Sequence, residues 1–114
     1  MSPKEPQEPG GPGRDRRREG GTELREREKV TKPPRFKVVL YNDDYTPMEF
    51  VVSLLESLFR MSPSRATQVM LNIHRKGSGV AGIYVLEVAE TRVASVHKLA
   101  EERGYPLRAG VEEE

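Results

Sequence analysis

Apolar side chains recur at helical spacing in two successive segments of the chain. In the first segment the apolar positions lie three or four residues apart and form one stripe, which consists of Met48, Val51, Val52, Leu55, Leu58 and Phe59. The second stripe consists of Ala66, Val69, Met70 and Ile73. Because residues three and four apart share one face of an α-helix, the pattern predicts two amphipathic helices in succession.

Helix-start residues precede both stripes. Thr46 is a candidate N-cap, the proline after it suits the first helical position, and Glu49 completes a capping box three residues beyond Thr46. A serine-proline pair at residues 62–63 repeats this arrangement before the second stripe. We therefore expect the first helix to end near Met61 and the second to stop before Gly77, with a very short turn between them.

Residues 36–41 and 83–88 are rich in β-branched and aromatic side chains, and we expect both segments to be strands. Residues 107–111 remain as a short last strand. Three glycines within residues 77–82 predict a loop before the second strand. Helical spacing returns after Thr91 at Val93, Val96, His97 and Ala100, and this third helix should end before Gly104. We expect His97 to be a structural residue.

The predicted order is strand-helix-helix-strand-helix-strand. It indicates an α+β fold, a small antiparallel three-stranded sheet with helices packed on one face, formed by residues 35–114. Residues 1–34 contain six prolines and five glycines, and their apolar residues are Met1, Leu24 and Val30. Such a segment buries too little apolar surface to offset its ordering entropy, so we expect a disordered N-terminal extension.

Charge and composition narrow the range of functions. Residues 1–34 carry nine basic and seven acidic side chains and residues 35–114 carry ten and eleven, so neither part has the strongly basic surface typical of nucleic-acid binding. The absence of cysteine excludes disulfides, thiolate metal sites and cysteine nucleophiles. No apolar run reaches the roughly 20 residues of a membrane span, and no signal peptide is visible. We expect a cytoplasmic protein that binds neither nucleic acid nor membrane.

The junction at residues 41–50 combines polar acceptors, a helix start and apolar side chains. Asp43 and Asp44 could serve acid-base or metal chemistry, or could hydrogen-bond the backbone of their own turn, and adjacent side chains on an extended segment point apart. His74 lies one turn after Met70 and could accept, donate or titrate near neutral pH, or be merely structural or solvated. Because no phosphate loop, Ser-His-Asp set or metal-ligand spacing occurs, we expect no enzymatic activity and no cofactor or metal.

Three segments match the pattern of a known family in order and spacing. They are NDDYTPMEFV at residues 42–51, RATQ at residues 65–68 followed by Met70 and His74, and EVAET at residues 87–91. On these residues the domain resembles the ClpS family of Clp protease adaptors. The resemblance implies a binding module that captures a large hydrophobic N-terminal residue (Leu, Phe, Tyr or Trp) of N-degron substrates. It also implies delivery of these substrates to a AAA+ unfoldase of the ClpA or ClpC type for degradation.

The same resemblance assigns roles to individual residues. The residues that would hydrogen-bond the α-amino group and first peptide unit of the substrate are Asn42, Asp43 and His74. Those that would surround its first side chain are Thr46, Met48, Val51, Met70, Ile73 and Leu107. Glu87 and Arg92 would dock on the unfoldase, and Arg92 stands where some family members have lysine. The N-terminal extension would assist delivery, and the adaptor would act as a monomer without a cofactor.

Two other functions are compatible with the residues alone. One is a protein-interaction domain without N-terminal-residue specificity, akin to the C-terminal domain of the ribosomal stalk protein, which has the same element order. The other is a metal-dependent hydrolase that uses Asp43, Asp44 and His74. A simple interaction surface needs no ammonium site beside an apolar cavity, so the combination of Asn42, Asp43 and His74 favours the adaptor.

Overall fold

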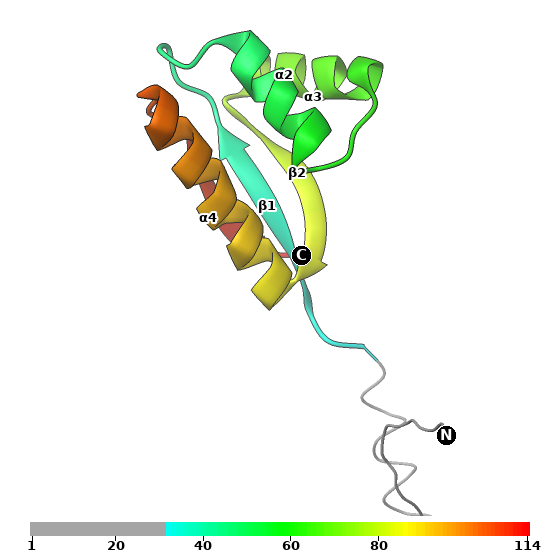
Figure 1. Ribbon diagram of the computed structural model, residues 1–114. Helices are drawn as coiled ribbons and strands as arrows, with labels where there is room; N and C mark the ends of the chain where they lie inside the picture. The colour runs from blue at the N-terminus through cyan, green and yellow to red at the C-terminus, as the bar shows by residue number, and fades with distance from the viewer. Residues whose placement is uncertain (1–31) are drawn as a thin grey trace, which may run out of the picture. The chain divides into compact units, whose positions relative to one another are not determined.

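The computed structural model describes residues 32–114, so the expected disorder of residues 1–31 lies outside the described part of the chain. The elements are β1 (Arg35–Tyr41), α2 (Met48–Ser57), α3 (Pro63–Lys76), β2 (Ser78–Val85), α4 (Leu86–Arg103) and β3 (Arg108–Glu113). Labels follow Figure 1. This order confirms the predicted α+β class and its strand-helix-helix-strand-helix-strand sequence.

The sheet has the strand order β2-β1-β3, with β1 antiparallel to both neighbours. Alternation along β1 turns Val38 and Leu40 toward the helices, where both are fully buried, and turns Lys37, Val39 and Tyr41 toward the other face. Figure 1 shows α4 lying along the sheet, while α2 and α3 pack across one end of it. The expected packing of helices on one face is therefore confirmed.

The core joins side chains from all three helices with the central strand. Leu54 and Leu55 of α2 and Val96 of α4 are at most 2% exposed and pack in the same cluster as Val38 and Leu40. Burial of each such side chain contributes about 1.5–3 kcal/mol. This burial anchors α2 and α3, the two helices that follow the candidate junction, on the sheet.

The second strand begins earlier than predicted. The glycine-rich segment expected to be a loop forms most of β2, which ends at Val85. Gly79 is required there by close packing, because a Cβ at this position would lie 2.7 Å from Cγ1 of Ile73 on α3. In this strand, glycine allows the helix to approach the sheet and does not mark a turn.

The third helix also begins earlier than predicted. Residues 86–88 were expected to extend the second strand, but α4 starts at Leu86. Leu86 and Val88 are 41% and 38% exposed, whereas Ala89 is fully buried and continues the helical stripe toward Val96. The error arose because an apolar run was taken as a strand, although two of its side chains lie on the surface.

The first helix is shorter than predicted, because α2 ends at Ser57 and not near Met61. The backbone N–H of Met61 still donates to the carbonyl oxygen of Leu55 at 3.1 Å, and Arg60 has a left-handed φ of 62°. These features are typical of a helix C-terminus that reverses sharply. The predicted short turn into α3 is present, and Ser62 caps α3 by accepting from the backbone N–H of Arg65.

His97 ties α4 to β3, which confirms the expectation that it is structural. Its Nε2 accepts a hydrogen bond of 3.0 Å from the backbone N–H of Ala109. We expect His97→Ala to lower the free energy of unfolding by about 1–3 kcal/mol, because a half-buried backbone donor loses its partner. Urea denaturation measures this change. His74→Ala is the matched control and should change stability by less than about 0.5 kcal/mol, because His74 is exposed.

Candidate functional site

A cavity of about 150 Å³ lies between the turn after β1, the start of α2 and the end of α3. Its lining residues come from all three segments and are Asn42, Asp43, Asp44, Thr46, Met48, Val51, Met70, Ile73 and His74. The structure thus brings together eight of the nine side chains that the family resemblance assigned to substrate binding. The predicted junction and the second helical stripe meet at one site.

The cavity has an apolar interior and a polar rim. Val51 and Met70 are 8% exposed and Ile73 is 3% exposed, so their side chains belong to the hydrophobic core as well as to the cavity wall. Asn42 and His74, in contrast, are exposed. An apolar group bound in this cavity would therefore lie directly beside polar hydrogen-bonding groups.

Asp43 organises the turn that forms one side of the cavity. Its Oδ1 accepts hydrogen bonds from the backbone N–H groups of Tyr45 and Thr46 at 2.8 and 2.7 Å, and its Oδ2 accepts from the Thr46 hydroxyl at 2.8 Å. The capping box predicted at Thr46 is therefore wrong. The Thr46 side chain bonds to Asp43, Pro47 takes the N-cap position, and α2 begins at Met48 without a side-chain cap.

These hydrogen bonds fix the charge of Asp43. Partial burial alone would raise the pKa of its carboxyl group, but the hydroxyl of Thr46 and the backbone N–H groups of Tyr45 and Thr46 together lower the pKa below the ordinary value of 3.8. The group is consequently a carboxylate at neutral pH. Since Oδ2 accepts one hydrogen bond from the protein, it retains a lone pair for a donor on a ligand.

The end of α3 is fixed relative to this turn by a glycine. Gly77 has a left-handed φ of 93°, and its N–H donates to the carbonyl oxygen of Ile73, which ends the helix. The Gly77 carbonyl oxygen then accepts a 2.9 Å hydrogen bond from the backbone N–H of Asn42. Asn42 and His74 are thereby held on neighbouring segments at the rim.

The positions of two residues, Leu107 and Asp44, differ from expectation. Leu107 was expected in the cavity, but it is a core residue that lines a separate hollow together with His97 and Tyr105. Asp44 does line the cavity, although adjacent carboxylates were expected to point apart. That expectation holds for an extended strand, whereas β1 has already ended at Tyr41 and residues 44–46 form a bend.

Glu87 and Arg92, the residues assigned to docking, lie away from the cavity on α4. Glu87 is exposed in the first turn of this helix. Arg92 is half-buried, with its guanidinium carbon 5.5 Å from the centre of the Tyr84 ring, a cation–π arrangement. Its Nε is buried and has no hydrogen-bond partner in the described part of the chain. Tyr84 and Arg92 therefore connect the end of β2 with α4.

Other site types find no support among residues 32–114. No group of three or more His, Cys, Asp or Glu side chains is placed to hold a metal ion, so the geometry gives the hydrolase alternative no support. None of the helices in this part of the chain is long and apolar enough to cross a bilayer. The fold and the cavity together define a small α+β ligand-binding domain.

Comparisons with known proteins agree on one family. The family model described as ATP-dependent Clp protease adaptor protein ClpS matches residues 31–110. An ATP-dependent Clp protease adapter protein ClpS from Lawsonia intracellularis is 52% identical over 83% of this chain and 87% of its own length. The corresponding protein of Nitratidesulfovibrio vulgaris is 54% identical over 81% of this chain and 92% of its own length.

A solved structure shows the same fold. Agrobacterium tumefaciens ClpS2 bound to L-phenylalaninamide superimposes with a TM-score of 0.70 and 42% sequence identity, covering 73% of this chain and all of that one. Together with the family match, this similarity settles the classification. The chain belongs to the ClpS family of ATP-dependent Clp protease adaptor proteins.

Proposed function

We propose that this ClpS-family chain recognises a free N-terminal large hydrophobic residue of N-degron substrates and delivers them to a Clp AAA+ unfoldase of the ClpA or ClpC type. The observation that carries the proposal is the cavity itself, in which an ionised carboxylate borders an apolar interior. A protein N-terminus with an apolar first residue presents the matching pair of groups, an ammonium next to an apolar side chain. Few other parts of a protein combine them.

The size of the cavity supports this ligand. A dry apolar cavity of about 150 Å³ accepts a benzene ring, so the side chain of Phe or Leu fits a space of this volume. Burial of such a side chain contributes about 1.5–3 kcal/mol. The related Agrobacterium tumefaciens ClpS2 was solved with L-phenylalaninamide, which carries a free α-amino group and a benzyl side chain. The ligand of that relative thus has the chemistry that the present cavity favours.

The polar rim would hold the α-amino group and the first peptide unit. An α-ammonium has three donors, and the Asn42 amide oxygen, the Asp43 carboxylate and a neutral His74 imidazole are suitable acceptors. The bond to Asp43 would be charge-assisted and the strongest of the three. Thr46 would support this role indirectly, because its hydroxyl donates to Asp43 and its methyl group is free to contact the substrate.

The apolar interior would select the first side chain. Val51, Met70 and Ile73 form a buried wall, and Met48, which is 42% exposed, stands at the mouth. The flexible thioethers of the two methionines can adapt to side chains of different shape. Branching at the Cβ of the substrate would crowd Met48, so we expect Leu and Phe to bind more tightly than Ile and Val.

Docking on the unfoldase would use the other end of the sheet. Val85, Leu86 and Val88 are 38–41% exposed and form an apolar corner around Glu87, where β2 passes into α4. Val85 pairs with Arg35, whereas the cavity begins after Tyr41, so the length of β1 separates the two sites by about 20 Å. An apolar corner with one exposed carboxylate suits a protein surface. Both partners could bind at once.

The remaining parts of the proposal follow from this arrangement. The adaptor would act as a monomer, because one chain supplies every residue of the cavity. It would act in the cytoplasm, where its ATP-dependent partner finds ATP. The N-terminal extension, residues 1–34, would assist delivery, and β1, which follows it, begins at Arg35 at the same end of the sheet as the apolar corner.

A peptide panel tests the proposal. Fluorescence anisotropy is measured with free-amine peptides that differ only in their first residue: Leu, Phe, Tyr, Trp, Ile, Val, Ala and Lys. We expect the first four to bind about 10-fold or more tightly than Ala, because burial of the larger side chain contributes most of the difference. Equal affinities across the panel would contradict recognition of the first residue.

A further inference from the structure

Gly79 lies outside the cavity but directly behind one of its walls. A Cβ atom at this position would lie 2.7 Å from Cγ1 and 3.7 Å from Cδ1 of Ile73. Ile73 is 3% exposed, which makes it the least exposed residue of the cavity lining. The side chain of Ile73 therefore lies between the cavity on one side and the backbone of β2 at Gly79 on the other.

The backbones on both sides of this contact are tied to the same strand. Gly79 pairs with Leu40 of β1. On α3, the carbonyl oxygen of Ile73 accepts from the N–H of Gly77, and the carbonyl oxygen of Gly77 accepts from the N–H of Asn42, which directly follows β1. Moving β2 and α3 apart would disrupt these hydrogen bonds, so the fold holds Gly79 close to Ile73.

The side chain of Ile73 has little freedom to avoid an added methyl group. Its Cγ1 is bonded directly to Cβ, and a β-branched side chain in a helix strongly prefers one χ1 rotamer. The protein interior around it is close-packed, whereas the cavity of about 150 Å³ that it lines offers free volume. A methyl group at position 79 would therefore push the side chain of Ile73 into the cavity and reduce the volume of the cavity.

We propose that Gly79 sets the size of the cavity, and thereby the largest first side chain of a substrate that this chain accepts. The inference rests on the proposed function of the cavity. Gly79 does not line the cavity, so it acts by positioning Ile73, and the two residues form a size-matched pair. One methylene group more or less in an apolar pocket changes discrimination between ligands by about 10-fold or more.

The test measures the affinities of Gly79→Ala for two free-amine peptides, one beginning with Trp and the other with Leu. We expect the ratio of the Trp affinity to the Leu affinity to fall about 10-fold relative to the unmodified protein, because Trp needs more of the cavity. A variant that was only less stable would lose affinity for both peptides equally, so the ratio would not change. An unchanged ratio would overturn the proposal.

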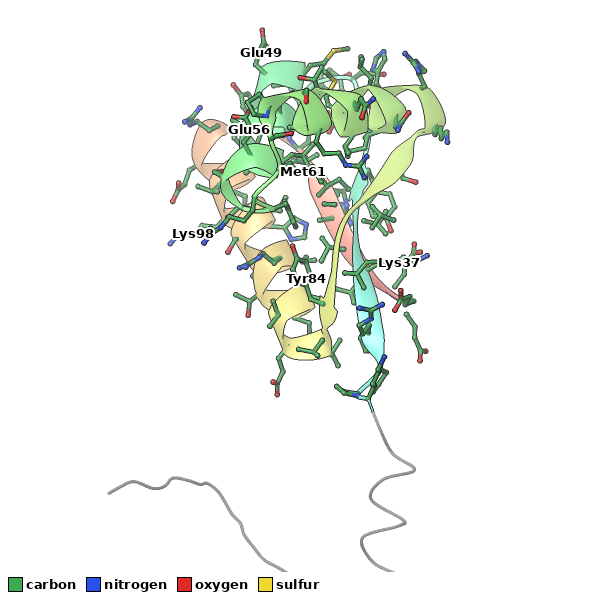
Figure 2. The ribbon with its side chains drawn as sticks, turned by 90° about the vertical axis from the view of Figure 1, so that its right-hand side faces the viewer. Lys37, Glu49, Glu56, Met61, Tyr84 and Lys98 are labelled. Atoms are coloured by element: carbon green, nitrogen blue, oxygen red, sulfur yellow. The ribbon has the colours of Figure 1, made fainter. Side chains whose placement is uncertain are left out.

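Gly82→Ala is the matched control on the same strand. A Cβ atom at Gly82 would lie 2.7 Å from Cε2 of Tyr84, so the substitution crowds β2 to a similar degree. Tyr84 does not line the cavity, and Figure 2 shows it on β2, below α2 and α3 and next to α4. The control should keep the ratio of the unmodified protein. A fall as large as that in Gly79→Ala would contradict a specific role of Gly79.

A compensating substitution tests the pairing of the two residues, and it keeps the proposal testable if Gly79→Ala alone does not fold. Ile73→Val removes Cδ1, so Gly79→Ala/Ile73→Val conserves the total side-chain volume and should restore the ratio of the unmodified protein. Ile73→Val alone enlarges the cavity and should raise the ratio. Equal ratios in Ile73→Val and the double variant would overturn the proposal.

The proposed function is tested separately in the same measurements. If the unmodified protein binds the Leu-initiated peptide more tightly than an Ala-initiated one, the function of the cavity stands whatever the Gly79 variants show. If the unmodified protein does not distinguish these two peptides, the proposed function fails, and the role of Gly79 fails with it.

Discussion

Acetylation of the α-amine of a Leu-initiated peptide is expected to lower its affinity by about 100-fold or more. Acetylation removes the positive charge and two of the donors, so the Asp43 carboxylate loses its charged partner. Removal of one member of a hydrogen-bonded charge pair costs about 2–5 kcal/mol in binding. Fluorescence anisotropy with matched free and acetylated peptides measures the ratio, and similar affinities would reject the cation-binding role of the turn.

A double-mutant cycle assigns this effect to Asp43. Asp43→Asn keeps an acceptor oxygen for the backbone N–H groups of Tyr45 and Thr46 but removes the charge. We expect this variant to bind the free-amine peptide much more weakly and to distinguish poorly between free and acetylated peptides, because the lost interaction is the same in both arms of the cycle. Asp44→Asn serves as the control, because Asp44 also lines the cavity but has no assigned bond to the substrate.

Charge reversal at Glu87 is expected to impair delivery of the substrate strongly. In a reconstituted system with a ClpA- or ClpC-type unfoldase and its protease, Glu87→Arg should slow degradation of a Leu-initiated protein by about 10-fold or more at limiting adaptor. The substitution replaces an exposed carboxylate with a side chain of the same charge sign as the partner's group. An attraction at the interface thereby becomes a repulsion. The affinity for the peptide should change less than about 2-fold, because the site lies about 20 Å away.

The matched control for delivery lies on the same helix. Glu102→Arg introduces the same change of charge at an exposed position near the other end of α4. It should support degradation at the rate of the unmodified adaptor. Equal rates for Glu87→Arg and the unmodified adaptor would exclude Glu87 from the docking surface, and equal losses in both variants would indicate a general effect of charge.

Local signals in the sequence were sufficient to predict the order of the helices and strands, but not to predict where each of them begins and ends. The serine-proline pair at residues 62–63 correctly predicted the start of α3, because a cap and a proline act within one helical turn. Gly79 and Leu86 were interpreted wrongly, since their roles depend on distant contacts. The glycine accommodates Ile73 of α3, and the leucine lies exposed at the start of α4.

Most residues of the cavity were expected from the resemblance to the ClpS family, and they come from short segments with strong local constraints. Met70, Ile73 and His74 share one face of a helix, so their common orientation follows from spacing alone. Leu107 lines a separate hollow instead, because its place depends on how β3 joins the sheet rather than on a neighbouring residue. Similarly, Thr46 appeared to be a helix cap, and only the folded turn shows that its hydroxyl bonds to Asp43.

The length of β1 has a thermodynamic consequence. Mutations more than about 7–10 Å apart that share no partners generally have additive effects on free energy, and the cavity and the apolar corner lie at opposite ends of this strand. Selection could therefore change which N-terminal residues are captured without changing the affinity for the unfoldase. Under the proposed function, one short strand would allow the two specificities of the adaptor to evolve separately.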